Sequence, residues 1–328
     1  MTLRQTMVLV IAAVVVLCGT VASLAFGAVS VPIGDVWSAL TGQLDAGPLK
    51  TIVLDLRLPR TIDALAVGAA LGIAGALLQG ALANPLASPD VIGVTSGAAF
   101  GAILVIVAFP TAIALVPISA LVFGLVASAI VFGLAWSGAG GGGVARLILT
   151  GIAISALFTA GTMALMTAYP DRVDSAIFFL AGGLTSEGWE ATRTVAPYLL
   201  AGLILAIILI RPLNRLALGD DVAASLGARP RIIRLGAGVA AALLAASSAA
   251  LAGLLAFVGL VVPHIARMAG RSSSHGFVVP ASALIGAGLV VVGDTISRVI
   301  LAPREIPVGP LMVVIGVPLF LWLLRKAV

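Results

Sequence analysis

Residues 57–97 read RLPRTIDALAVGAALGIAGALLQGALANPLASPDVIGVTSG, with two arginines around a proline at the start. The 26 residues from Ala64 to Pro89 then carry no charge. A run of that length exceeds the roughly 20 residues that an α-helix needs to cross a bilayer. It ends in a polar, proline-bearing turn from Asn84 to Asp90. The stretch therefore predicts a transmembrane helix with a cationic end and a polar hinge, as in a transport path.

One face of this helix is built from small residues. Gly68, Gly72, Gly75 and Gln79 recur at spacings of four, three and four, so they share a face. Small residues at such spacing let helix backbones approach closely in lipid. We expect this face to line a pathway. For Gln79, a hydrogen bond between two helices is an equal alternative.

The composition indicates an integral membrane protein. Of 328 residues, 61% are hydrophobic and 9% are charged, and the mean hydropathy is +1.23. A soluble domain carries about 25% charged residues, and the long continuous apolar runs do not resemble the short alternating segments of a membrane barrel. The net charge of +5 is scattered over loops, which favours a role in membrane orientation over nucleic-acid binding. The single cysteine, Cys18, excludes a disulfide framework.

The charge-free runs predict an all-α polytopic fold of ten transmembrane helices in one transmembrane domain, residues 1–328. The least certain divisions fall at 109–117 and 250–256, inside two long apolar runs. The expected spans are 6–28, 61–82, 92–109, 113–136, 146–168, 192–212, 233–252, 254–268, 277–298 and 306–325.

Counting the bases supports one orientation. With both termini in the cytoplasm, eleven of the 18 lysines and arginines fall inside and seven outside, in agreement with the positive-inside rule. Five spans per half also mean that the second half enters the membrane inverted relative to the first, a common plan for transporters. We therefore expect two inverted five-helix halves.

Two segments between the spans are expected to be helical without crossing. The apolar piece from Ser175 to Leu184 is too short to span and is placed at the outer surface. Residues 218–227 predict a short helix on the cytoplasmic surface, capped by Asp220 or Asp221 and ended by Gly227.

No catalytic, metal or cofactor site is expected. His264 and His275 are interpreted as structural, and neither Lys50 nor Lys326 stands in a P-loop context, so the chain has no nucleotide site of that type. Asp294 is the one acid expected deep in a span, where it can pair with Arg298 four residues later. This scarcity argues for an external energy source. An ion-coupled secondary transporter is the remote alternative.

The outer arginines are the sharper signal. Arg57 and Arg60 stand just before the second span, and Arg298 and Arg304 follow the ninth. Any one of them alone is typical of headgroup anchoring. Two such sites, one from each half, predict a basic docking face for an acidic partner or substrate.

The sequence resembles the FecCD family of ABC importer permeases. The matching pieces run in order along nearly the whole chain: Arg57–Arg60, Gly68–Leu71, Gln79, Asn84–Pro89, Gly93–Val94, Ala217–Asp220, Leu226–Gly227, Phe257–Leu260, Pro263–Arg267, Asp294–Arg298, Glu305–Gly309 and Ile315–Pro318.

This resemblance implies the subunit of a larger machine in the inner (plasma) membrane. Two permease subunits, identical or paralogous, enclose one pathway; two cytoplasmic ATPases drive it, and a periplasmic or lipid-anchored binding protein delivers the substrate. A ferric siderophore or similar iron chelate is the expected substrate, with haem or cobalamin as alternatives. The chain itself is then not an enzyme, and lipid rather than nucleic acid surrounds it.

The resemblance also implies roles for individual positions. Binding-protein docking falls to Arg57 and Arg298. ATPase coupling falls to Leu218, Gly219, Asp220, Ala223, Leu226 and Gly227. The inner gate falls to Asn84, Leu86, Gly143 and Val144.

Overall fold

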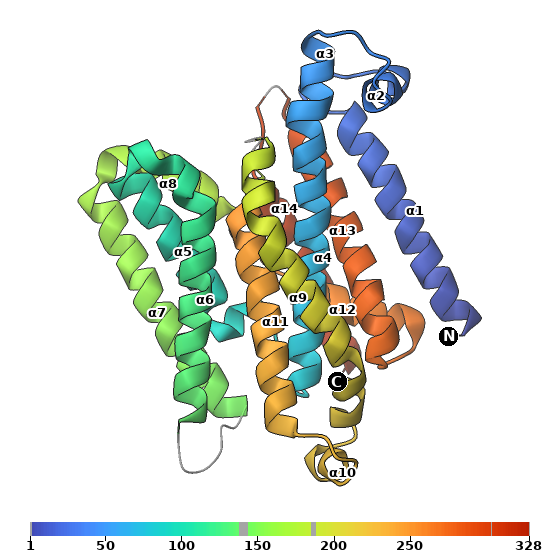
Figure 1. The fold of residues 1–328 in the computed structure, drawn as a ribbon, viewed down its shortest axis with the longest axis vertical. Coiled ribbons are helices and arrows are strands. Elements are labelled where there is room, and N and C mark those ends of the chain that lie inside the picture. Colours follow the sequence, from blue (N-terminus) through green and yellow to red (C-terminus); the bar gives the residue numbers. More distant parts are fainter. Residues whose placement is uncertain (1, 138–143, 185–187, 303, 328) are drawn as a thin grey trace.

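The computed structural model describes residues 2–137, 144–184, 188–302 and 304–327, and these form helices joined by short connections (Figure 1). The α-helices are α1 (Leu3–Ala25), α2 (Ile33–Leu40), α3 (Pro48–Thr51), α4 (Leu58–Ala81), α5 (Val94–Ile103), α6 (Val116–Trp136), α7 (Val144–Ala168), α8 (Val173–Ala181), α9 (Trp189–Leu216), α10 (Asp220–Ser225), α11 (Pro230–Ala252), α12 (Val258–Gly270), α13 (His275–Val299) and α14 (Val308–Ala327). The π-helical turns η1 (Ile52–Arg57) and η3 (Leu104–Ala108) and the 3₁₀ turns η2 (Pro89–Ile92), η4 (Pro110–Leu115) and η5 (Pro170–Arg172) complete the list.

Each predicted span coincides with an apolar helix. Among the described residues, seven helices are long and apolar enough to cross a membrane, and three shorter apolar helices, at Val94–Ala108, Val258–Gly270 and Val308–Trp322, account for the other predicted spans. The protein is an all-α polytopic membrane protein. The exact span boundaries stay a prediction.

The second span begins earlier than the sequence suggested. α3, η1 and α4 form one continuous helix, Pro48–Ala81, of 34 residues, whereas a start at residue 61 was expected. Its upper end projects beyond the other long helices, beside the unpredicted helix α2 (Figure 1). Arg57 and Arg60 therefore lie within a continuous helix and not in a loop before its first turn.

The chain breaks near Gly253, as predicted, but the next helix starts later than expected. Gly253 and Phe257 have left-handed φ angles of 62° and 67°, so residues 254–257 connect α11 to α12 without helical hydrogen bonding. Glycine adopts such angles at little cost, whereas Phe257 is strained there. The helix α12 therefore begins four residues after the predicted span start at 254.

The helices form two inverted halves. The first half is α1, α4, α5, α6 and α7; the second is α9, α11, α12, α13 and α14. α4 packs on α13 and α12, and in the same way α11 packs on α6 and α5, so exchanging the halves preserves the pairings. α4 and α11 also pack on each other and form the centre of the molecule.

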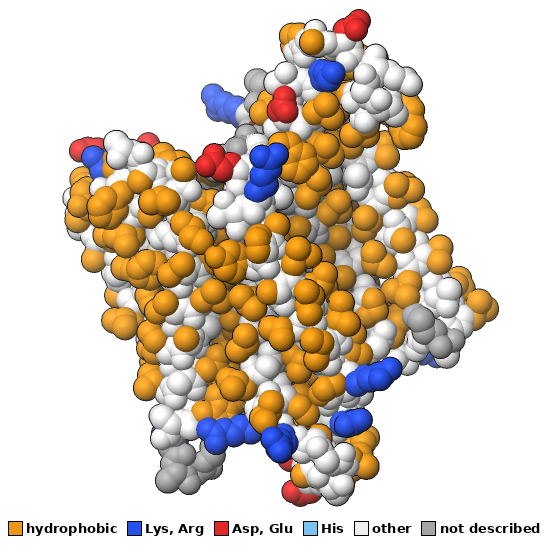
Figure 2. Space-filling model, viewed as in Figure 1, with side chains coloured by type: hydrophobic (Ala, Val, Ile, Leu, Met, Phe, Trp, Pro, Cys, Tyr) orange, Lys and Arg blue, Asp and Glu red, His pale blue; other side chains and the backbone are white. Residues whose placement is uncertain are grey.

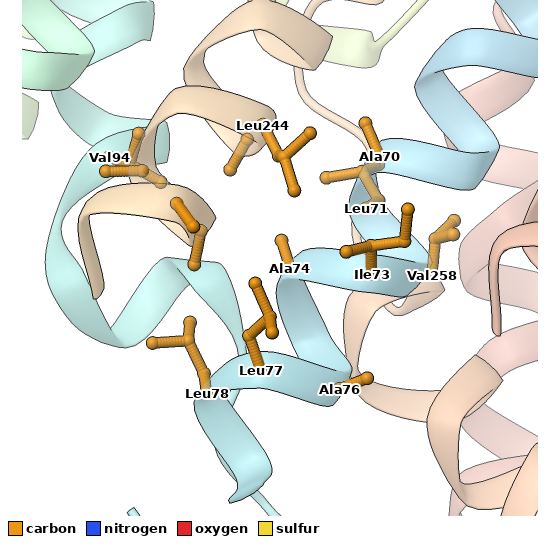
Figure 3. Close-up of a cluster of buried hydrophobic side chains, with 14 of the residues drawn as sticks. Ala70, Leu71, Ile73, Ala74, Ala76, Leu77, Leu78, Val94, Leu244 and Val258 are labelled. Carbon is orange, nitrogen blue, oxygen red and sulfur yellow. The ribbon is translucent and has the colours of Figure 1, made fainter. Parts of the chain in front are cut away.

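The core lies where α4 meets α5, α11 and α12. Leu77 and Leu78 of α4 are fully buried, and Figure 3 shows the α4 side chains directed toward Val94, Leu244 and Val258. By contrast, α1, α7 and α9 expose apolar residues over most of their surface. Figure 2 shows these exposed side chains as a hydrophobic band across one face, as expected of a surface that contacts lipid tails.

Candidate functional site

The small-residue face of α4 is closed by other helices. Gly68, Gly72 and Gly75 are buried, and a Cβ at each would overlap a backbone carbonyl: Gly286 or Ser282 of α13, or Gly259 of α12. The close approach expected of small residues is present. Backbones of α12 and α13 occupy the space beside these glycines, where a pathway wall was expected.

Gln79 ends the same face and bonds to α12. Its Nε2 donates to the carbonyl of Leu260 over 3.1 Å, its Oε1 accepts from Arg267 Nη2, and only 4% of the residue is exposed. Of the two alternatives for Gln79, the structure shows the hydrogen bond between helices.

Arg57 caps the C-terminus of α1. Its Nη1 donates to the carbonyls of Leu24 (2.7 Å) and Ala25 (2.9 Å), and its Nη2 donates to Val29. The last carbonyls of a helix lack intrahelical donors and carry the negative end of the helix dipole. A guanidinium group supplies both the hydrogen bonds and the compensating charge.

Four further charged residues form an outer ion cluster: Arg60, Asp294, Arg298 and Glu305. Arg60 bonds to Asp294 (2.9 Å) and Glu305 (2.7 Å), and Arg298 bonds to Asp294 (3.0 Å), which confirms the predicted pairing across one helical turn. The sequence did not reveal the Arg60–Asp294 bridge. It joins α4 of one half to α13 of the other, and no local spacing signals it.

The docking arginines are not surface charges. Arg57 is 7% exposed and Arg298 is 3% exposed, and both guanidinium groups lie beside Gly27, below the outer surface. The expected exposed basic face is therefore wrong for these two side chains. Their burial follows from the end of α1, whose carbonyls and Ser23 hydroxyl take up their donors. Arg172, Arg193 and Arg304 are exposed bases at this end.

Asp63 is a buried acid that the sequence reading passed over. Only 4% of it is exposed; Thr192 Oγ1 of α9 donates to it over 2.8 Å, and it lines a cavity of about 150 Å³ between α4, α8, α9 and α11. Asp294 is thus not the one buried acid in a span. The sequence could have indicated this, because Asp63 lies within the first turn of the predicted second span.

The predicted cytoplasmic helix is present but shorter, as α10. Gly219 (φ 98°) and Gly227 (φ 77°) flank it with left-handed backbone that glycine adopts readily. Leu218, Val222 and Leu226 are about half exposed, whereas Ala223 is fully buried against the body of the protein. α10 thus presents an apolar surface outward at the lower end of the molecule (Figure 1).

Arg234 of α11 attaches α10 to α4. Its Nη1 and Nη2 donate to the two carboxylate oxygens of Asp220 over 2.7 and 2.8 Å, and its Nε donates to the carbonyl of Ala81 over 3.0 Å. The hydrogen bonds from Arg234 hold the pKa of the Asp220 carboxyl below its usual range. The pair therefore stays ionised at neutral pH and is lost only when the pH falls through that lowered value.

Two of the predicted gate residues, Asn84 and Leu86, lie in the turn after α4. Asn84 Oδ1 accepts from the backbone N–H of Leu86 over 2.9 Å, a side-chain turn typical of asparagine. Leu86 is exposed, and Val144 begins α7 in a half-buried position. Gly143 lies outside the described residues. η2, which follows this turn, packs on α7, because the carbonyl of Val91 occupies the space that a Cβ at Gly151 would need.

Comparisons with known proteins give consistent results. The FecCD transport family model matches residues 12–326. The chain is 37% identical over 323 residues to the Fe(3+)-citrate import system permease protein YfmE of Bacillus subtilis, covering 98% of this chain and 96% of the relative. It is 37% identical to the hemin transport system permease protein HmuU of Yersinia pestis, covering 92% and 90%.

A solved structure agrees over the same length. It is described as an inward-facing conformation of a transporter assigned to the metal-chelate type of ABC transporter, with a TM-score of 0.85, 30% identity, and coverage of 98% of this chain and 99% of that one. Sequence motifs, inverted helical halves and this near full-length likeness lead to one conclusion. The chain belongs to the FecCD transport family and is the permease subunit of an ABC importer.

Proposed function

We propose that this permease carries a ferric chelate, such as a citrate or siderophore complex of iron, across the inner membrane. The observation that supports it is the 37% identity, over 98% of the chain, to a permease named for Fe(3+)-citrate import. Haem is the second candidate, because a hemin permease is equally identical over 92% of the chain. Cobalamin remains a third member of the same substrate class.

The pathway is proposed to lie between two permease subunits, identical or paralogous. Since α4 is closed inside the chain, its glycine face is available only for packing. Asn84, Leu86 and Val144, with the loop that precedes α7, are proposed as the inner gate. Both termini are proposed to lie in the cytoplasm.

The test of substrate is uptake by the complete complex in liposomes that contain ATP. Iron-55 citrate, a ferric hydroxamate and haem are offered separately, each with a binding protein that holds it. Uptake of a ferric complex in preference to haem supports the proposal, and uptake of haem alone overturns it. Uptake by this chain without partners, driven by an ion gradient, would instead establish a secondary transporter.

Two cytoplasmic ATPases are proposed to bind α10 through its apolar surface. We expect Leu218→Asp with Leu226→Asp to abolish co-purification of the ATPase, because two buried charges would oppose the contact. Leu3→Asp is the matched control, since Leu3 is also exposed at the lower end but lies on α1. Retention of the ATPase by the double variant would exclude α10 as the contact.

A substrate-binding protein is proposed to dock at the opposite end, near Arg57 and Arg298. Because both guanidinium groups are occupied by α1, docking through them requires carboxylates of the partner to replace backbone carbonyls. Such charged hydrogen bonds are about twice as strong as neutral ones. Arg57→Gln and Arg298→Gln should weaken docking beyond any change in unfolding temperature; unchanged docking would remove the role.

A further inference from the structure

The last turn of α4 is held by basic side chains from three different helices. Arg267 of α12, His275 of α13 and Arg234 of α11 contact residues 79, 80 and 81 in turn. We call these three side chains the basic collar. All three come from the second half of the chain, whereas α4 and the turn that follows it belong to the first.

The Arg234 contact satisfies a carbonyl that the helix cannot satisfy. The carbonyl of Ala81 would accept from the residue four positions later, but that residue is Pro85, which has no N–H. Arg234 Nε takes its place over 3.0 Å, while the remaining nitrogens of the guanidinium hold Asp220. One planar group thus bonds the first residue of α10 to the end of α4.

His275 makes a second link from the same region. Its Nδ1 and backbone N–H lie 3.0 and 2.8 Å from Asn214 Oδ1, in the last turn of α9. The opposite edge of the ring rests on Gly80, where a Cβ would overlap Nε2. α9 leads directly into α10, so this contact also connects the root of α10 to α4 (Figure 1).

Arg267 provides the third contact and differs from the other two. It bonds to Gln79, whose amide nitrogen bonds back to Leu260 on the same helix, α12. Two members of the basic collar therefore connect α4 to α10 or its root, and one fixes α4 to α12. Residues 82–90, the turn around Asn84, begin immediately beyond these contacts.

We propose that the basic collar transmits displacement of α10 to the turn at Asn84, with Arg234 as the main positioning residue. This inference rests on the proposed docking of the ATPase at α10. A shift of α10 relative to α4 breaks either the two hydrogen bonds from Arg234 to Asp220 or the one from Arg234 to the carbonyl of Ala81. Moving α4's last turn with α10 keeps them intact. The turn at Asn84 would then move whenever the ATPase displaces α10.

The test compares Arg234→Gln and Asp220→Asn in the complete complex in nanodiscs and liposomes. Spin labels at Leu86 and Leu149, both exposed, report the distance between the turn and α7 after Cys18→Ser removes the native thiol. We expect the unmodified complex to change this distance when trapped with ATP and vanadate. Both variants should lose that change. Arg234→Gln, which lies outside α10, should hydrolyse ATP at a rate within about twofold of the parent.

The same variants should separate hydrolysis from uptake. We expect iron-55 citrate uptake per ATP to fall about tenfold, the factor that corresponds to losing one charge-assisted hydrogen bond. The uptake per ATP of Arg234→Lys should lie between that of the parent and that of Arg234→Gln, because one ammonium group cannot make all the hydrogen bonds of a planar guanidinium group. Arg231→Gln is the control: Arg231 is exposed, three residues earlier on α11, and should behave as the parent.

Two results overturn the proposal in distinguishable ways. If the parent complex responds to ATP and Asp220→Asn retains the full distance change and uptake ratio, transmission through the basic collar is excluded while the transport function stands. If the parent complex itself neither binds the ATPase nor hydrolyses ATP, the docking at α10 fails and the inference fails with it. Asp220 is half exposed, so its variant tests the link even if Arg234→Gln does not fold.

Discussion

At the scale of single residues, the charges at the outer end act as a connected set. The Asp294 side chain is fully buried and bonds to both Arg60 and Arg298, while Arg60 also reaches the partly exposed Glu305. Buried charges are tolerated when each has a partner of opposite sign. Arg60 and Arg298 are therefore stable at this depth chiefly because Asp294 lies between them.

Removing that central carboxylate should be costly. We expect Asp294→Ala to lower the free energy of unfolding by about 3–5 kcal/mol, because two buried guanidinium groups would lose their shared partner. Thermal unfolding of the detergent-solubilised permease measures this. Glu305→Gln, at the 40% exposed end of the cluster, should cost about 1 kcal/mol or less. Equal losses in the two variants would contradict the central position of Asp294.

At the scale of elements, α4 is defined by close contact with α12 and α13. Lipid tails are as apolar as the side chains, so such contacts depend on packing rather than on hydrophobic burial. Three glycines leave room for carbonyls of the neighbouring backbones. The middle of α4 thus packs tightly against the second half of the chain, and its polar contacts lie at its two ends.

Adding a methyl group to this contact should separate the helices. Gly75→Ala places a Cβ on the carbonyl of Gly259, which belongs to the backbone and cannot rotate away. We expect a loss of roughly 1–3 kcal/mol, as for other overpacked sites, and poor yield of folded protein by size-exclusion chromatography. Gly133→Ala on α6 is the control: its Cβ meets open space, and it should be neutral or slightly stabilising.

The elements also show what a single sequence can reveal. The charge-free run predicted a helix at 61–82 and the glycine spacing predicted its close packing, because both depend on local geometry. The glycine spacing did not distinguish a pathway wall from a contact between helices, since the difference depends on which segment of the chain lies opposite. Likewise, Arg57 has the same local sequence whether it faces solvent or caps α1. The sequence shows that Pro85 lacks an N–H, but only the fold shows that Arg234 donates to the carbonyl of Ala81 in its place.

At the scale of the whole molecule, the two ends differ in charge. Figure 2 shows Lys and Arg side chains along the lower edge of the hydrophobic band and mixed charges at the upper end. The lower end carries α10 and the start of α11, with Arg229, Arg231 and Arg234. Cytoplasmic loops of membrane proteins carry an excess of lysine and arginine, which favours the lower end as the cytoplasmic one. The bias comes from the second half, which holds nine of the eleven bases expected in the cytoplasm.

This asymmetry gives a direct test of orientation. In a Cys18→Ala background, we expect Gln43→Cys, exposed beside α2 at the upper end, to react with a membrane-impermeant maleimide in right-side-out vesicles. Ser225→Cys, exposed at the end of α10, should react only after the vesicles are opened. The reverse pattern would place α10 outside, where no ATP is present, and would exclude an ATPase at that helix. Labelling of both sites in sealed vesicles would show mixed insertion, which the arginines at the lower end are expected to prevent.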